Sequence, residues 1–104
     1  MANYADRAAI MNSSAFINRI AVGVAKYALF IIGNAANQTR DQIAWATNAA
    51  RNPGSVASQI VSMCIWDAAV TALPDGTVDA SSLTDAQVQG IVESVINNQV
   101  FKWF

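Results

Sequence analysis

The residues that most often carry out catalysis are sparse in this 104-residue chain, which contains no histidine. Histidine is the usual general base near neutral pH and a common nitrogen ligand of zinc. Its absence excludes every Ser-His and Cys-His nucleophile pair. Cys64 is the single cysteine and cannot form an internal disulfide, so within its apolar stretch we expect it to act as a small buried hydrophobe.

Acidic residues offer the other possible site, in the loop that contains Asp75, Gly76 and Asp79. This spacing lacks the alternating acidic ligands and the distal Glu of an EF-hand calcium loop, so it indicates a solvated turn. Asp67 lies near the apolar stripe of a predicted helix, where we expect it to reach solvent or to pair with an arginine. No glycine-rich loop has the spacing that holds phosphate. We therefore expect a non-enzymatic protein without catalytic, metal-binding or cofactor-binding residues.

The composition indicates a protein whose surface is partly covered by other proteins. Hydrophobic residues make up 54% of the chain and charged residues only 12%, about half of the roughly 25% that is usual in soluble domains. A free monomer needs charged surface to resist association, so we expect an oligomer or a subunit of a complex. The length fits a single domain, residues 1–104, with one modest core.

The net charge of −1 is unevenly distributed along the chain. Residues 1–51 carry five basic and two acidic side chains, whereas residues 52–104 carry Lys102 alone against five acidic ones. This polarity can orient neighbouring copies head to tail, and ordinary scatter of screened charges explains it equally well. The basic residues form no cluster that could neutralise several phosphates together, so we expect no specific nucleic-acid binding.

Apolar residues recur at helical spacing, and no run alternates convincingly enough to predict a sheet. We expect a small all-α bundle of about four main helices with short connections between antiparallel neighbours, ending in an apolar tail at residues 99–104. The predicted helices lie near residues 4–12, 15–33, 40–51, 56–72 and 85–98. Asn52-Pro53-Gly54 predicts a stop, after which Ser55 can cap the next helix.

Local signals mark several of the other helix boundaries. Asn12-Ser13-Ser14 predicts a break and a new N-cap, and Gly33-Asn34 is typical of a helix that closes with a left-handed turn. Capping boxes begin at Thr39 and Thr84, each followed three residues later by a glutamine. Gly23, inside the helix predicted at 15–33, indicates a close helix crossing.

Each main helix carries an apolar stripe that can face a common core. In the helix at 15–33 the stripe comprises Phe16, Ile17, Ile20, Val24, Tyr27, Ala28 and Ile31. In the helix at 40–51 a narrower face comprises Ile43, Ala46 and Ala50, with Trp45 beside it. In the helix at 56–72 the stripe comprises Val56, Ile60, Val61, Cys64, Ile65, Ala68 and Ala69. In the helix at 85–98 it comprises Val88, Ile91, Val92, Val95 and Ile96.

The stretch from Ala15 to Ile32 is apolar enough to raise the question of a membrane span. Arg19 and Lys26 interrupt it, and the uncharged windows that remain are shorter than the roughly 20 residues that a spanning helix needs. A helix that lies on a membrane surface usually carries several basic residues along its polar face. We therefore expect no membrane association.

The chain ends in four large apolar side chains within a segment that is normally frayed and polar. We assign them as the candidate partner interface because aromatic residues dominate interface hot spots. They are Val100, Phe101, Trp103 and Phe104. The alternative is that the tail folds back onto its own bundle, since a domain this small gains stability from docking its own end.

Two segments, YADRAAIMNSSAFINRIAVGVAKYAL and LTDAQVQGIVESVINN, together cover about two-fifths of the chain. They resemble small helical proteins encoded among the head and neck genes of tailed bacteriophages. The ending VFKWF departs from those proteins, which tend to end in small residues, and it leaves the docking partner open.

The resemblance implies a structural protein of the virion, assembled in the host cytoplasm from copies of itself and other virion proteins. A subunit of the head-to-tail connector or neck, in a ring of copies, is the first choice, because a sparsely charged domain with an apolar tail suits a ring that touches unlike neighbours. A minor capsid-bound or decoration protein of the same particle is the alternative. A small helical protein-binding module outside any particle is the hypothesis from a different class.

Overall fold

A computed structural model of the chain describes residues 13–64 and 83–103. Four α-helices occupy most of this part, named α2 (Ser14–Gly33), α3 (Arg40–Arg51), α4 (Pro53–Cys64) and α6 (Asp85–Val95). Shorter turns are η1 (Ala35–Asn37), η3 (Ile96–Val100) and η4 (Phe101–Trp103). No strand occurs within these ranges, and the predicted all-α fold class is confirmed. The predicted helix at 4–12 lies outside the described residues.

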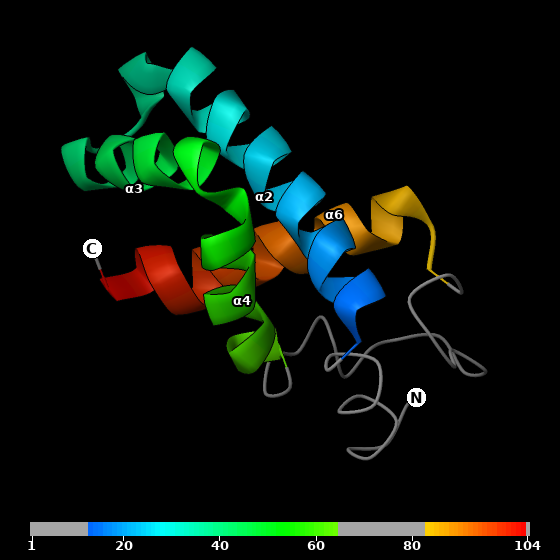
Figure 1. Ribbon diagram of the computed structural model, residues 1–104. Helices are drawn as coiled ribbons and strands as arrows, with labels where there is room; N and C mark the ends of the chain where they lie inside the picture. The colour runs from blue at the N-terminus through cyan, green and yellow to red at the C-terminus, as the bar shows by residue number, and fades with distance from the viewer. Residues whose placement is uncertain (1–12, 65–82, 104) are drawn as a thin grey trace.

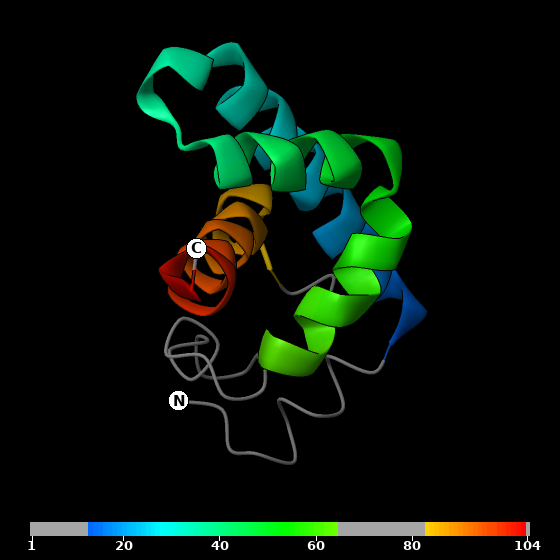
Figure 2. The same ribbon diagram turned by 90° about the vertical axis from the view of Figure 1, so that its left-hand side faces the viewer.

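α2 is the central element of the fold, since α3, α4 and α6 all pack against it. α3 turns back beside the C-terminal half of α2, and α6 crosses the N-terminal half of α2 (Figure 1). α4 leaves the end of α3 at a steep angle, as Figure 2 shows from the side. The short connection between α3 and α4 therefore makes a corner, whereas the sequence predicts an antiparallel pair.

The helix starts follow the predicted capping chemistry. Ser13 Oγ accepts a hydrogen bond from Phe16 N at 3.1 Å and caps α2. Thr39 Oγ1 accepts from Gln42 N at 3.1 Å, and Gln42 Oε1 accepts from Thr39 N at 2.9 Å. The same reciprocal pair joins Thr84 to Gln87 at the start of α6. Each box satisfies two backbone donors that would otherwise lack a partner.

Two boundaries differ from the prediction. α2 ends at Gly33, but Asn34 has a φ of −116°, so the chain continues into η1 without a left-handed residue. α4 begins at Pro53, earlier than the predicted residue 56, and Ser55 lies inside the helix. Proline is suited to the first helical position because its fixed φ matches the helix and its missing N–H is not needed there. The predicted continuation of this helix through 65–72 lies outside the described residues.

The C-terminal segment is also more regular than predicted. α6 ends at Val95, before the predicted residue 98, but the chain keeps turning through the π-helical η3 and the 3-10 turn η4. The segment predicted as an apolar tail thus begins with helical turns that reach Trp103. A widened π turn changes which side chains face the core, and Val100 and Phe101 both pack against it.

The core is built largely from the predicted stripes, although the predicted Ile17, Tyr27 and Ile43 are only partly buried. Every predicted core residue of α6 is buried, and in α4 Val56, Ile60 and Val61 are buried. The buried side chains of α2 are Phe16, Ile20, Val24, Ala28 and Ile31. In α3 the buried residues are Ala46 and Ala49, whereas the predicted Ala50 is only partly buried. The buried face of α3 is thus rotated from Ala50 toward Ala49.

Gly23 marks the close approach of α2 and α6, which confirms the predicted crossing. A Cβ atom at this position would lie 2.8 Å from Val92 Cγ2 and 3.1 Å from Gln89 Oε1. Val92 is fully buried and branched at Cβ, so it has little room to move. Glycine is required here for packing, whereas Gly90 on the open side of α6 has no neighbour within 4 Å of its Cβ position.

Gly23→Ala is expected to lower the free energy of unfolding by about 1 kcal/mol, because overpacking outweighs the better helix propensity of alanine. Gly90→Ala, the matched control, should raise that free energy by up to about 1 kcal/mol. Urea unfolding followed by circular dichroism measures both. A stabilised Gly23→Ala protein would contradict the close crossing.

Candidate interaction surface

Phe101 docks the C-terminal segment onto its own chain. Its ring meets Trp45 of α3 edge-on, with centroids 5.2 Å apart, and lies 6.5 Å from the ring of Tyr27 in α2. Edge-to-face and offset arrangements at these distances are the favourable ones for aromatic pairs. Of the four residues predicted as a partner interface, Val100 and Phe101 therefore pack within the chain.

The structure describes only the backbone of Trp103 and does not describe Phe104. Trp103 ends η4, and its side chain lies outside the described part of the chain, as does Phe104. The assignment of these four residues to a partner interface stays a prediction. What the contacts establish is that Phe101 also serves the internal packing of the bundle.

Tyr27 connects the docked C-terminal segment to the outer surface of α2. Its hydroxyl accepts a hydrogen bond from Asn97 Nδ2 at 3.0 Å. On its other side, its ring stacks on Phe30 at a centroid distance of 6.1 Å and an interplanar angle of 10°. A continuous row of rings thus runs from Trp45 through Phe101 and Tyr27 to the exposed Phe30.

α2 carries a second apolar side that points away from the core. The exposed large hydrophobic side chains of the described residues all lie on it, namely Val22 (56% exposed), Leu29 (62%), Phe30 (60%) and Ile32 (38%). Helical spacing aligns Val22, Lys26, Leu29 and Gly33, with Phe30 and Ile32 to either side. We call these six residues the outer face of α2. Exposed apolar groups gathered on one helix face are typical of a binding surface.

Sequence reasoning missed the outer face, although the sequence contains a signal for it. The predicted core stripe accounts for one side of the helix and leaves Val22, Leu29, Phe30 and Ile32 unexplained. A helix that is apolar all round normally buries both sides. The apolar residues outside the core stripe therefore indicated a second apolar side of this helix.

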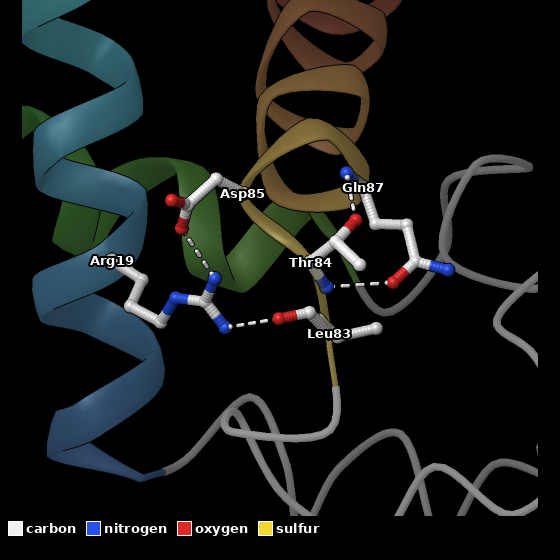
Figure 3. A network of polar contacts seen from close by, with 5 residues as sticks. All are labelled: Arg19, Leu83, Thr84, Asp85 and Gln87. Atoms are coloured by element: carbon white, nitrogen blue, oxygen red, sulfur yellow. Dashed lines mark hydrogen bonds and ion pairs between the residues drawn. The ribbon is translucent and has the colours of Figure 1, made fainter.

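Arg19 holds the start of α6 beside the N-terminal half of α2. Its Nη1 donates to the carbonyl oxygen of Leu83 and its Nη2 to Asp85 Oδ1, each at 2.8 Å (Figure 3). The Asp85 side chain is 94% exposed, so this ion pair contributes little to stability. The bond to the Leu83 backbone is the stronger anchor, because Leu83 is buried and its carbonyl needs a donor.

A shallow groove lies between α2 and α6, next to the outer face. Its polar side chains include Arg19, Lys26, Asp85 and Gln89. Arg19 is bonded to Asp85, and Gln89 Nε2 donates to the carbonyl of Gly23 at 3.3 Å. Within the described ranges no three His, Cys, Asp or Glu residues come together as a possible metal site. The hydrogen bonds in this groove join α2 to α6.

The length and composition of α2 would also allow it to cross a membrane. An 18-residue window of the helix has a mean hydropathy of 1.6, and a third of this window is buried inside the protein. Core helices of soluble proteins meet the same criterion. The buried stripe of α2 is packed against its own bundle, so the large apolar side chains of α2 that another molecule can reach are those of the outer face.

Comparison with known proteins adds no further guide to function, because no family model, curated protein or solved structure matches the chain.

Phe101→Ala is expected to lower the free energy of unfolding by about 2 kcal/mol, since it removes a half-buried ring and two aromatic contacts. Gln99→Ala, two residues away and exposed, should change it by less than about 0.5 kcal/mol. Chemical unfolding measures the difference, and near-ultraviolet circular dichroism reports the surroundings of Trp45. Equal stability of the two variants would show that Phe101 does not dock on its own chain.

Proposed function

We propose that this protein is a non-enzymatic assembly subunit whose outer face of α2 binds another protein. The observation that carries the proposal is the exposure of Leu29 and Phe30 on a helix whose opposite side is fully packed. Large apolar side chains on a rigid helix bind with little loss of conformational entropy, because the backbone is already ordered. Phenylalanine and leucine in such a position supply contact area at the centre of an interface.

The size of the outer face indicates how it contributes to an assembly. Its exposed apolar area is roughly 400 Å², which lies within the range of patches that are often functional on monomers. A stable complex usually buries about 800 Å² on each partner, roughly twice the area of the outer face. One such contact is marginal alone and becomes stable when a subunit is held by several neighbours. This arrangement suits a closed ring or shell.

We propose a tailed-phage virion as the setting, with the head-to-tail connector or neck ring as the first choice. The support comes from the resemblance of the two helical segments and from the low content of charged residues, 12%. The unequal charge of residues 1–51 and 52–104 favours a head-to-tail contact between neighbours, as a ring requires. A minor capsid-bound or decoration protein would use the same face but follow the symmetry of the shell.

A protein-binding module outside any particle is the second candidate. The outer face of α2 supports it as well, because an exposed helix face can receive one partner helix without any ring. The two functions differ in where the protein is found: a virion subunit is present in purified particles at a fixed ratio, and a free module is absent from them.

The number of copies per particle tests the proposed setting. Quantitative mass spectrometry of purified particles, calibrated against the major shell protein, should give a few copies that match one ring. A number that scales with the shell would make the protein capsid-bound, and absence from particles would exclude both virion roles.

In the same assay Leu29→Glu should reduce incorporation by about tenfold or more, because burying an unpaired carboxylate is strongly unfavourable.

Ala44→Glu is the matched control for this variant, since Ala44 is exposed on α3 and the substitution makes the same change in charge. It should enter particles as well as the unaltered chain does. If Leu29→Glu also enters normally, the outer face of α2 is not the contact that assembly needs.

Removal of Trp103 and Phe104 tests the predicted role of the chain end without disturbing the docked Phe101. We expect the shortened protein to fold with nearly unchanged stability and to lose incorporation, because aromatic side chains often anchor a partner interface. Circular dichroism checks the fold, and mass spectrometry of particles measures the loss. Normal incorporation of the shortened chain would refute insertion of the tail into a neighbour.

A further inference from the structure

The position of the exposed apolar side chains limits how a second copy of this chain could cover them. In the described ranges, all large hydrophobic side chains with high exposure belong to α2, and α3, α4 and α6 contribute none. Within that part of the molecule, a second copy can match the outer face with large apolar groups only by presenting its own outer face. Such a contact of like with like is isologous and has a twofold axis.

The C-terminus of α2 carries a partial negative charge that favours one orientation of a second copy. The last turn of α2 contains no basic residue, although a helix C-terminus carries a partial negative charge. The carbonyl oxygens of Ile32 and Gly33 receive no hydrogen bond from any donor in the described segments. Both residues are exposed, so these carbonyls are accessible to a cation from another molecule.

Lys26 is placed to provide that cation. It is exposed on the outer face, and no described residue forms a hydrogen bond or an ion pair with it. It precedes Gly33 by seven residues, or two helical turns, on the same line of the helix. When two α2 helices run antiparallel with Leu29 opposite Phe30 of the copy, Lys26 of each lies opposite Gly33 of the other.

Gly33 allows the close approach that this contact needs. A Cβ atom built at Gly33 meets nothing within 4 Å, and glycine itself adds no side chain, so the neighbouring carbonyls are open.

From the apolar match and the charge match together, we propose that two copies of this protein pair through their outer faces. In this dimer the α2 helices are antiparallel, centred between Leu29 and Phe30, and Lys26 of each copy contacts the α2 C-terminus of the other.

The dimer rests on the proposed function in one respect, namely that the outer face is a protein interface. The two faces together hold roughly 800 Å² of exposed apolar surface, and in this register Val22 lies beyond the end of the other α2 helix. The buried area is therefore below the usual 1,200–2,000 Å² of stable interfaces, and the pairing is weak. A weak dimer protects the outer face in solution and is displaced when an assembly partner takes the same face. The dimer is therefore the form that precedes assembly.

A lipid surface would contact the same residues, but the position of Lys26 disfavours it. Lys26 lies between Val22 and Phe30 within the outer face, where a bilayer would surround its ammonium group with acyl chains. The carbonyl oxygens at the end of a second α2 solvate that ammonium group. The charge thus distinguishes a protein helix from a lipid surface.

Sedimentation equilibrium of the full chain from about 10 μM to 1 mM tests the pairing. We expect a monomer–dimer equilibrium, which Leu29→Glu abolishes and Ala44→Glu leaves unchanged. Lys26→Ala should weaken the dimer severalfold, whereas Arg40→Ala, the same loss of charge on exposed α3, should not. Circular dichroism confirms that each variant folds. A monomer throughout this range, or a dimer that Leu29→Glu leaves intact, overturns the proposal.

Disulfide formation tests the register. In a Cys64→Ser background, a mixture of Lys26→Cys and Gly33→Cys copies should form a disulfide-linked pair under mild oxidation. Either variant alone should not, because equivalent residues lie about 10 Å apart along the helix axis, beyond the reach of a disulfide. Linkage of Lys26→Cys to itself, without linkage in the mixture, overturns the antiparallel register.

Three further results separate this proposal from its alternatives. Binding of the monomer to vesicles of phosphatidylcholine and phosphatidylglycerol, blocked by Leu29→Glu, would replace the dimer with a lipid contact. A chain that stays monomeric yet enters particles through Leu29 would overturn the dimer and leave the proposed function standing. A dimer that never occurs in particles would support the pairing and refute the virion role.

Discussion

Burial of one stripe of α2 is the interaction on which the rest of the structure depends. Phe16, Ile20, Val24, Ala28 and Ile31 are almost completely inaccessible to solvent, and α3, α4 and α6 all pack on this helix. A chain of this size has one core, so the helix that all others contact determines their positions. Gly23 adds a steric condition, because it sets how closely α6 can approach. The same helix exposes its outer face, so the packed side and the proposed binding side belong to one rigid element.

Much of the fold was predictable because its determinants are local. The capping boxes at Thr39 and Thr84 require only four consecutive residues, and both formed as expected. The stripe of α6 repeats at helical spacing, and each of its residues is buried. The departures arise where tertiary contacts decide. Pro53 can end one helix or begin the next, and only the packing of α4 on α2 selects the corner that it makes.

The candidate surface was harder to predict than the fold. Apolar residues at the chain end suggested a partner interface, but a sequence cannot tell whether Phe101 reaches Trp45 of its own chain or a neighbour. The position of Phe101 follows from the π turn at 96–100, which no sequence motif predicted. Conversely, Leu29 and Phe30 lie in a helix that is apolar on all sides, so their exposure could be recognised only once the position of the core was known. The packing of α3, α4 and α6 together decides which apolar side of α2 is buried and which is exposed.

The central claim is that the outer face of α2 is covered in the functional state, and solvent labelling of its side chains tests this directly. Hydroxyl-radical footprinting with mass spectrometry would compare Leu29 and Phe30 in the dilute purified chain and in the native assembly. We predict rapid labelling in the dilute chain and strong protection in the assembly, with Trp45, which is partly buried within the chain, labelled equally in both states. Equal labelling of Leu29 and Phe30 in the two states would contradict the account.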